Sequence, residues 1–206
     1  MIGIMVKDLI YMRRQVKTLG ILLVFYIVLF STMNDTSQFV SMITMIMVLM
    51  CSILIMNTFA YDELSKWDIY SLSLPITKFQ LVLCKYLLTV SLSGVGVVLS
   101  IAFAVSKNAL NVETWLGFYV AFGAAMLFSS ILIPLLYKFG VQRARILLVC
   151  VLMLPTFGIF FFKKLNIPMP SLAALDFVLK ISPVILVALV ALSLTISYQV
   201  FKNKEV

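Results

Sequence analysis

The sequence of residues 61–79 is YDELSKWDIYSLSLPITKF, the longest polar interruption between the apolar runs of this chain. Read as a helix, the stretch places its apolar and aromatic side chains on one face, because they recur every three or four residues. These side chains are Leu64, Trp67, Tyr70 and Leu74. Pro75 lacks an amide hydrogen and disfavours helix at the preceding residue. We therefore expect a short amphipathic helix over residues 62–74.

The residues after the proline predict the start of a second helix. Thr77 can accept a hydrogen bond from the amide of Gln80, whose side chain can reach back to the amide of Thr77, which makes a capping box. Two interpretations of the whole stretch stay open. It is either a polar loop in which Trp67 and Tyr70 anchor the chain at the membrane interface, or a rigid element on which a soluble partner docks.

The composition is that of a polytopic, all-α membrane protein. Hydrophobic residues make up 63% of the chain and charged residues 12%, whereas soluble domains are about half apolar and about a quarter charged. The 206 residues leave no room for a separate soluble domain, so we expect one transmembrane domain over residues 1–206. There is no histidine and no Gly-x-x-x-x-Gly-Lys nucleotide loop, and the three cysteines lack ligand spacing. We expect no metal, cofactor or nucleic-acid partner for this chain.

Six apolar segments match the roughly 20 residues that cross a bilayer. The expected spans are residues 18–33, 38–60, 80–105, 115–137, 146–162 and 181–201. Residues 1–17 carry an apolar stripe at helical spacing, with cations away from it, which predicts an interfacial helix. Small residues in the third and fourth spans, Gly117 among them, predict close helix packing.

The connection between the last two spans is expected to be helical. Ser171 can cap a short helix that extends to Lys180, and Ser182 followed by Pro183 is typical of the start of the final span. Of the 16 basic residues, about three quarters fall in the N-terminus, the loops after spans two and four, and the C-terminal tail. By the positive-inside rule, these segments and both termini are cytoplasmic.

The positions of the charged residues argue against catalysis in this chain. Lys85 lies near the start of the third span, and we expect it to reach the cytoplasmic interface as an anchor. The acidic residues, including Asp8 and Asp62, are expected in loops, ends or interfaces. Carboxylates in the middle of a span would indicate proton relays or an intramembrane protease. We therefore expect neither, and no enzyme activity.

Residues 59–86 resemble the ABC-2 type transporter permeases, the membrane subunits of small bacterial ABC exporters. The match consists of an acidic pair, a short helix, a Ser-Leu-Pro-Ile-Thr-Lys turn, and a Lys-Tyr pair early in the next span. The residues that carry it are Asp62, Glu63, Ser73, Leu74, Pro75, Ile76, Thr77, Lys78, Lys85 and Tyr86. The wider layout is also similar, with an N-terminal elbow helix, six spans and a helical outer connection.

The resemblance implies that the 62–74 helix is a coupling helix, on which a separate ABC ATPase docks. The docking residues would be Asp62, Glu63, Leu64, Lys66, Trp67, Asp68, Tyr70, Leu74 and Pro75. ATP and Mg²⁺ would bind the ATPase, and two permease copies would work together in the bacterial cytoplasmic membrane. Smaller members of the family are similar to exporters of antimicrobial peptides and phenol-soluble modulins, so amphipathic peptide cargo is implied.

Two other functions stay open at this point. A six-span substrate-binding membrane module of an importer would capture a small ligand without an ATPase. A membrane immunity protein would transport nothing and would tolerate disruption of residues 61–79.

Overall fold

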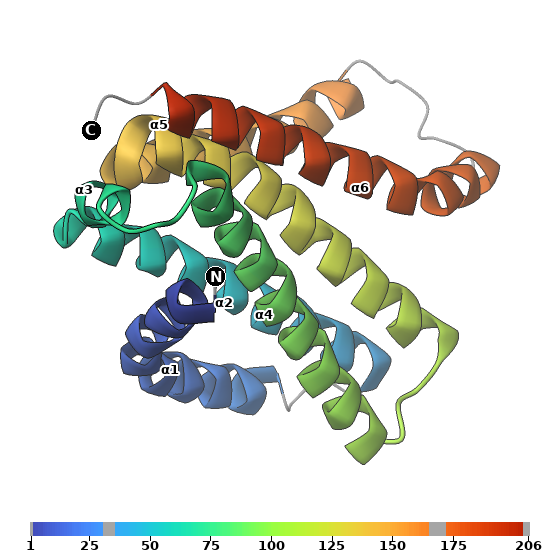
Figure 1. Ribbon diagram of the computed structural model, residues 1–206. Helices are drawn as coiled ribbons and strands as arrows, with labels where there is room; N and C mark the ends of the chain where they lie inside the picture. Colours follow the sequence, from blue (N-terminus) through green and yellow to red (C-terminus); the bar gives the residue numbers. More distant parts are fainter. Residues whose placement is uncertain (1, 31–35, 165–171, 204–206) are drawn as a thin grey trace.

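The computed structural model describes residues 2–30, 36–164 and 172–203, and the regular structure of these residues is helical throughout. For residues 151–164 and 172–179 it describes the backbone alone. The helices are α1 (Ile2–Phe30), α2 (Thr36–Leu64), α3 (Trp67–Leu72), α4 (Lys78–Ser106), α5 (Val112–Lys164) and α6 (Leu172–Lys202). Figure 1 shows that the short α3 lies at the same end of the molecule as the start of α4 and the end of α6.

The core forms where α2, α4, α5 and α6 pack together, and α1 packs on α2 and α4. Its fully buried side chains include Ile55, Val82, Leu88, Ile133 and Phe201. The predicted close packing of small residues is confirmed at Gly117 of α5, where an added Cβ would lie 2.8 Å from the Ser41 Oγ of α2.

Four described segments are long and apolar enough to cross a membrane. They are Gln38–Leu64, Lys78–Ser106, Val112–Leu147 and Lys180–Lys202, and the apolar segment Gln15–Leu29 is shorter. The four long segments overlap expected spans two, three, four and six. Expected span 18–33 coincides with the shorter segment, and most side chains of span 146–162 lie outside the described part of the chain. The count of six spans therefore stays a prediction.

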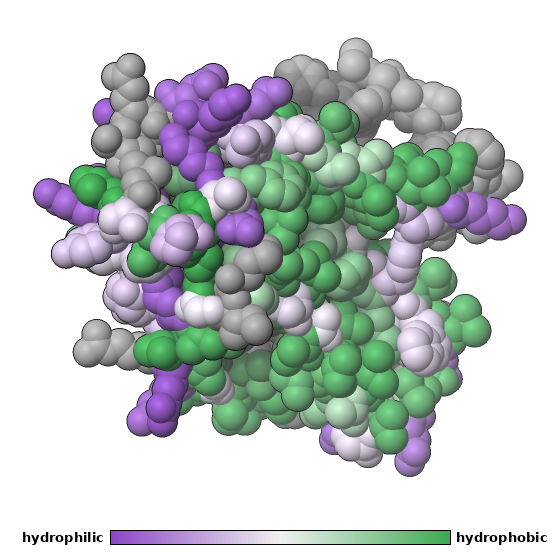
Figure 2. Space-filling view, in the orientation of Figure 1, coloured by the Kyte–Doolittle hydropathy of each residue, from purple (hydrophilic) through white to green (hydrophobic). Residues whose placement is uncertain are grey.

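The surface is divided between one strongly polar end and a broad apolar side. Figure 2 shows hydrophilic side chains gathered on the left, over α3 and the C-terminal end of α6, and hydrophobic side chains across the adjoining helices. An apolar surface of this extent is stable when lipid covers it. The 61–79 stretch lies at the polar end.

Two predicted helix boundaries are wrong. The interfacial helix 1–17 and the first span are one continuous helix, α1, because no proline or cap interrupts the chain between them. The expected helix start at Ser182 is also absent, since α6 runs from Leu172 through Pro183. The Ser182 hydroxyl bonds the Tyr119 hydroxyl of α5 instead of capping a helix. Ser171, the other expected cap, lies outside the described residues.

Candidate functional site: the α2–α3 turn and the charges beneath it

The 62–74 stretch is not the single helix that its periodicity predicts. α2 continues to Leu64, Lys66 adopts a left-handed conformation (φ 50°, ψ 40°), and α3 starts at Trp67. The Ser65 hydroxyl donates back to the Tyr61 carbonyl at 2.8 Å, a local bond that competes with helix continuation. The Lys66 amide closes the turn on the Glu63 carbonyl at 3.3 Å. The apolar side chains therefore do not share one helical face.

The turn nevertheless presents an apolar surface to the outside, which we call the docking face. It consists of Leu64, Ile69, Tyr70 and Leu74, with exposed fractions of 81%, 56%, 68% and 41%. Sequence reasoning missed Ile69, because the expected face was drawn for an unbroken helix. Lys66 and Pro75 are also exposed. An exposed apolar cluster among polar residues is typical of a surface that binds another protein.

Trp67 does not belong to this face, although the sequence placed it there. Its side chain is half-buried, and the Lys7 ammonium of α1 lies 3.9 Å from the centre of its ring. A cation over an indole face is held by the ring quadrupole. Ser71, one turn further on, is buried. One side of α3, with Trp67 and Ser71, therefore packs against the rest of the protein, and the opposite side, with Ile69 and Tyr70, is exposed.

Four charges lie directly beneath the turn and form what we call the four-charge cluster: Lys7, Asp8, Asp62 and Lys85. The Lys85 ammonium is 2.9 Å from Asp8 Oδ2 and 2.7 Å from Asp62 Oδ2, and the Lys7 ammonium is 2.5 Å from Asp62 Oδ1 and 3.3 Å from Asp8 Oδ1. Two cations thus face two carboxylates, and the ion pairs connect α1, α2 and α4. The formal charges cancel, as buried charges require.

The burial of this cluster corrects the prediction for Lys85. Lys85 is 4% exposed and does not reach the interface as an anchor, because Asp8 and Asp62 hold it inside. Its partners Asp8 and Asp62 are 0% and 6% exposed, although they lie near the start of α1 and the end of α2. Lys85 also donates to the Thr58 hydroxyl at 3.2 Å. The sequence did contain a signal for these ion pairs: a lysine inside an apolar segment is usually paired with a carboxylate or another polar group.

Glu63 connects the turn to α5. Its carboxylate accepts a hydrogen bond from the Val141 amide at 2.9 Å. Val141 follows Gly140, where α5 is interrupted by a non-helical conformation (φ 73°, ψ 173°). The break lies between the regions of expected spans four and five.

The segment after α3 returns the chain into the core. The capping box predicted at Thr77 is confirmed: the Gln80 amide donates to the Thr77 hydroxyl, and the Thr77 amide donates to the Gln80 side chain, each at 3.2 Å. The Lys78 ammonium donates to the carbonyl of Lys202 at 3.2 Å. The end of α6 is therefore joined to the start of α4 beside the docking face.

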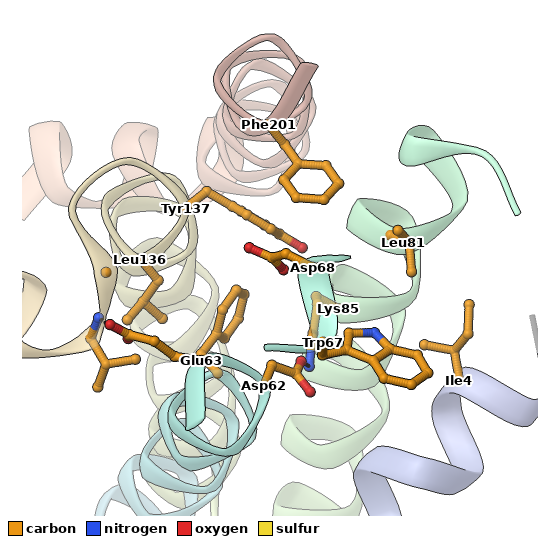
Figure 3. A pocket seen from close by; sticks show the side chains of 13 residues that line it. Ile4, Asp62, Glu63, Trp67, Asp68, Leu81, Lys85, Leu136, Tyr137 and Phe201 are labelled. Carbon is orange, nitrogen blue, oxygen red and sulfur yellow. Dashed lines mark hydrogen bonds and ion pairs between the residues drawn. The ribbon is translucent and has the colours of Figure 1, made fainter. Parts of the chain in front are cut away.

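A cavity of about 100 Å³ lies between the turn and the helices. Figure 3 shows Asp68 of α3 and Tyr137 of α5 pointing towards one another across it, with Lys85 and Asp62 below them. Within the described residues, no group of three or more His, Cys, Asp or Glu side chains could hold a metal ion. The geometry is suited to holding helices together through charge pairs beneath an exposed contact surface.

The fold and this site define a helical membrane protein whose polar end presents exposed apolar side chains at the α2–α3 turn. In a comparison with known protein families, residues 3–202 match the family described as ABC-2 family transporter protein. The chain therefore belongs to this family. The resemblance to ABC-2 type permeases is thereby confirmed over these residues, and the resemblance to peptide exporters stays a prediction. No match was found among curated proteins or among solved structures.

Proposed function

We propose that this chain is the permease subunit of an ATP-driven exporter, and that an ABC ATPase binds its docking face. One observation carries the proposal: the docking face is exposed, while Trp67 on the other side of the same turn packs under Lys7. Tyr70 and Leu74 are exposed and can enter a partner's groove, and tyrosine is among the residues that most often dominate the binding energy of an interface. ATP and Mg²⁺ would bind the ATPase.

The attachment explains how force from an ATPase would reach the membrane. Trp67 is held under Lys7, and Lys7 belongs to the four-charge cluster that joins α1, α2 and α4. Charge pairs that are buried and mutually saturated are costly to separate. A partner that moves the docking face would therefore move the ends of three helices together, rather than bending a loose loop.

The direction, the cargo and the assembly follow from the family resemblance. We infer export of amphipathic or hydrophobic molecules such as peptides, by a pair of permease copies, in a bacterial cytoplasmic membrane. The excess of basic residues at the polar end supports a cytoplasmic location for the docking face and both termini.

The test is co-purification from native membranes in mild detergent, with an ATPase identified by mass spectrometry. The variant is Tyr70→Ala with Leu74→Ala. The matched control is Trp115→Ala with Leu110→Ala, which removes an exposed aromatic and an exposed leucine (54% and 44%) near the α4–α5 connection. We expect a stoichiometric ABC ATPase, bound at least about thirtyfold more weakly by the docking-face variant and unchanged in the control.

Equal ATPase recovery from both variants would show that the docking face is wrong. A chain that purifies alone with a tightly bound small molecule would favour a substrate-binding module instead.

A further inference from the structure

Glu63 and Val141 lie 78 positions apart in the sequence, yet the Glu63 carboxylate reaches the Val141 amide at 2.9 Å. Val141 is the first residue after the break in α5, and amides in the first turn of a helix have no partner carbonyl in a preceding turn. A carboxylate at this point caps the helix that follows and complements the positive end of its dipole. Glu63 thus acts as a cap supplied from another helix.

The break itself depends on glycine. Gly140 has φ 73° and ψ 173°, a conformation that is essentially restricted to glycine. A Cβ added there would lie 3.1 Å from Glu63 Oε1. The carboxylate therefore packs directly on the bare backbone at the point where α5 changes direction, and Figure 3 shows it reaching across from α2 to that helix.

Glu63 also belongs to the docking turn. It is next to Leu64 of the docking face, and its own carbonyl accepts the Lys66 amide that closes the turn. Glu63 itself is exposed, whereas Val141 is buried, so the bond joins a surface residue of the turn to the core. The same residue therefore joins the left-handed turn at Lys66 to the break at Gly140.

We infer that Glu63 is a positioning residue that couples the docking turn to α5. When the turn is displaced, the carboxylate leaves the Val141 amide, and the part of α5 after Gly140 loses its cap. The identity of what displaces the turn rests on the proposed function, but the coupling itself is a property of this chain and is tested without a partner.

The first experiment measures amide hydrogen exchange of a peptide spanning residues 139–146 in the full chain in lipid nanodiscs. Loss of a charged hydrogen bond in Glu63→Ala should speed exchange there by about ten- to a hundredfold. Glu63→Gln keeps an acceptor oxygen without the charge, so a smaller increase is expected. The matched control is Glu113→Ala, in the first turn of the same helix, which should leave exchange at residues 139–146 unchanged.

The second experiment tests coupling rather than capping alone. Lys66→Val strains the left-handed turn, because a β-branched residue disfavours positive φ, whereas Lys66→Gly tolerates it. We expect Lys66→Val to speed exchange at residues 139–146 severalfold when Glu63 is present, and to add nothing in a Glu63→Ala background. Lys66→Gly should have little effect in either.

Unchanged exchange at residues 139–146 in both Glu63→Ala and Glu63→Gln would overturn the cap. A Lys66→Val effect that persists without Glu63, or that never occurs, would overturn the coupling and leave Glu63 as a local cap. Neither result depends on whether an ATPase binds, so the inference and the proposed function fail separately.

Discussion

Replacing Lys85 with methionine would remove one of the two cations from the four-charge cluster while nearly preserving side-chain volume. Asp8 would lose its 2.9 Å partner, and Asp62 would lose its 2.7 Å partner. Lys7 alone would then face two buried carboxylates. Breaking a buried pair by removing one partner costs about 3–5 kcal/mol, because the remaining charge stays buried.

The assay is thermal unfolding of the purified chain in one detergent, followed by intrinsic fluorescence. For a chain of this size, a loss of about 3–5 kcal/mol lowers Tm by roughly 6–20 °C. Adding Asp8→Asn to Lys85→Met restores neutrality, since Lys7 and Asp62 then form a single pair. We expect the double variant to be more stable than Lys85→Met alone.

The matched control is Lys107→Met, at the exposed C-terminal cap of the same helix. Surface substitutions of this kind change stability by about 0.5 kcal/mol or less. The reasoning is refuted if Lys85→Met and Lys107→Met have the same Tm, or if Asp8→Asn lowers the stability of the Lys85→Met variant further.

Three further substitutions test separate parts of the fold by the same unfolding assay. Gly140→Ala should cost about 1–3 kcal/mol, because alanine is strained at the backbone conformation found there; wild-type stability would contradict this. Tyr86→Phe removes a buried hydroxyl that lies 2.6 Å from the Ser193 hydroxyl, and should cost about 1 kcal/mol, whereas Tyr70→Phe at the exposed docking face should change nothing. Thr77→Ala should cost about 1 kcal/mol through loss of the helix cap, and an unchanged Tm would mean that the capping box contributes nothing to stability.

The sequence predicted the helical membrane class, four apolar segments long enough to cross a membrane and the capping box because each depends on local signals. Apolar length, helical periodicity and a Thr-x-x-Gln spacing are complete within a few residues. The boundaries at residues 17 and 182 failed for a different reason. Serine is a common helix cap, but the Ser182 hydroxyl is hydrogen-bonded to the Tyr119 hydroxyl of α5. Tyr119 lies 63 positions away in the sequence, so the local pattern around Ser182 does not reveal this partner.

The geometry of the 61–79 stretch differs from the one that the sequence predicted. Periodicity assigned Trp67 and Tyr70 to one face, whereas the left-handed Lys66 turns α3 so that Trp67 meets Lys7 and Tyr70 points outward. The partnership of Lys85 with Asp8 joins residues 77 positions apart, so no spacing rule reveals it. A requirement for charge balance around Lys85 would have pointed to a buried carboxylate, without saying which one.

Protection of the docking face is the most direct test of the account. Tyr70→Cys and the control Lys107→Cys would be labelled with a thiol reagent in native membranes, with and without the co-expressed ATPase, and each site would be quantified by mass spectrometry. We predict that the ATPase strongly slows labelling at position 70 and leaves labelling at position 107 unchanged. Equal labelling at position 70 in both conditions, with the ATPase demonstrably bound, would contradict the claim that this face is where the ATPase binds.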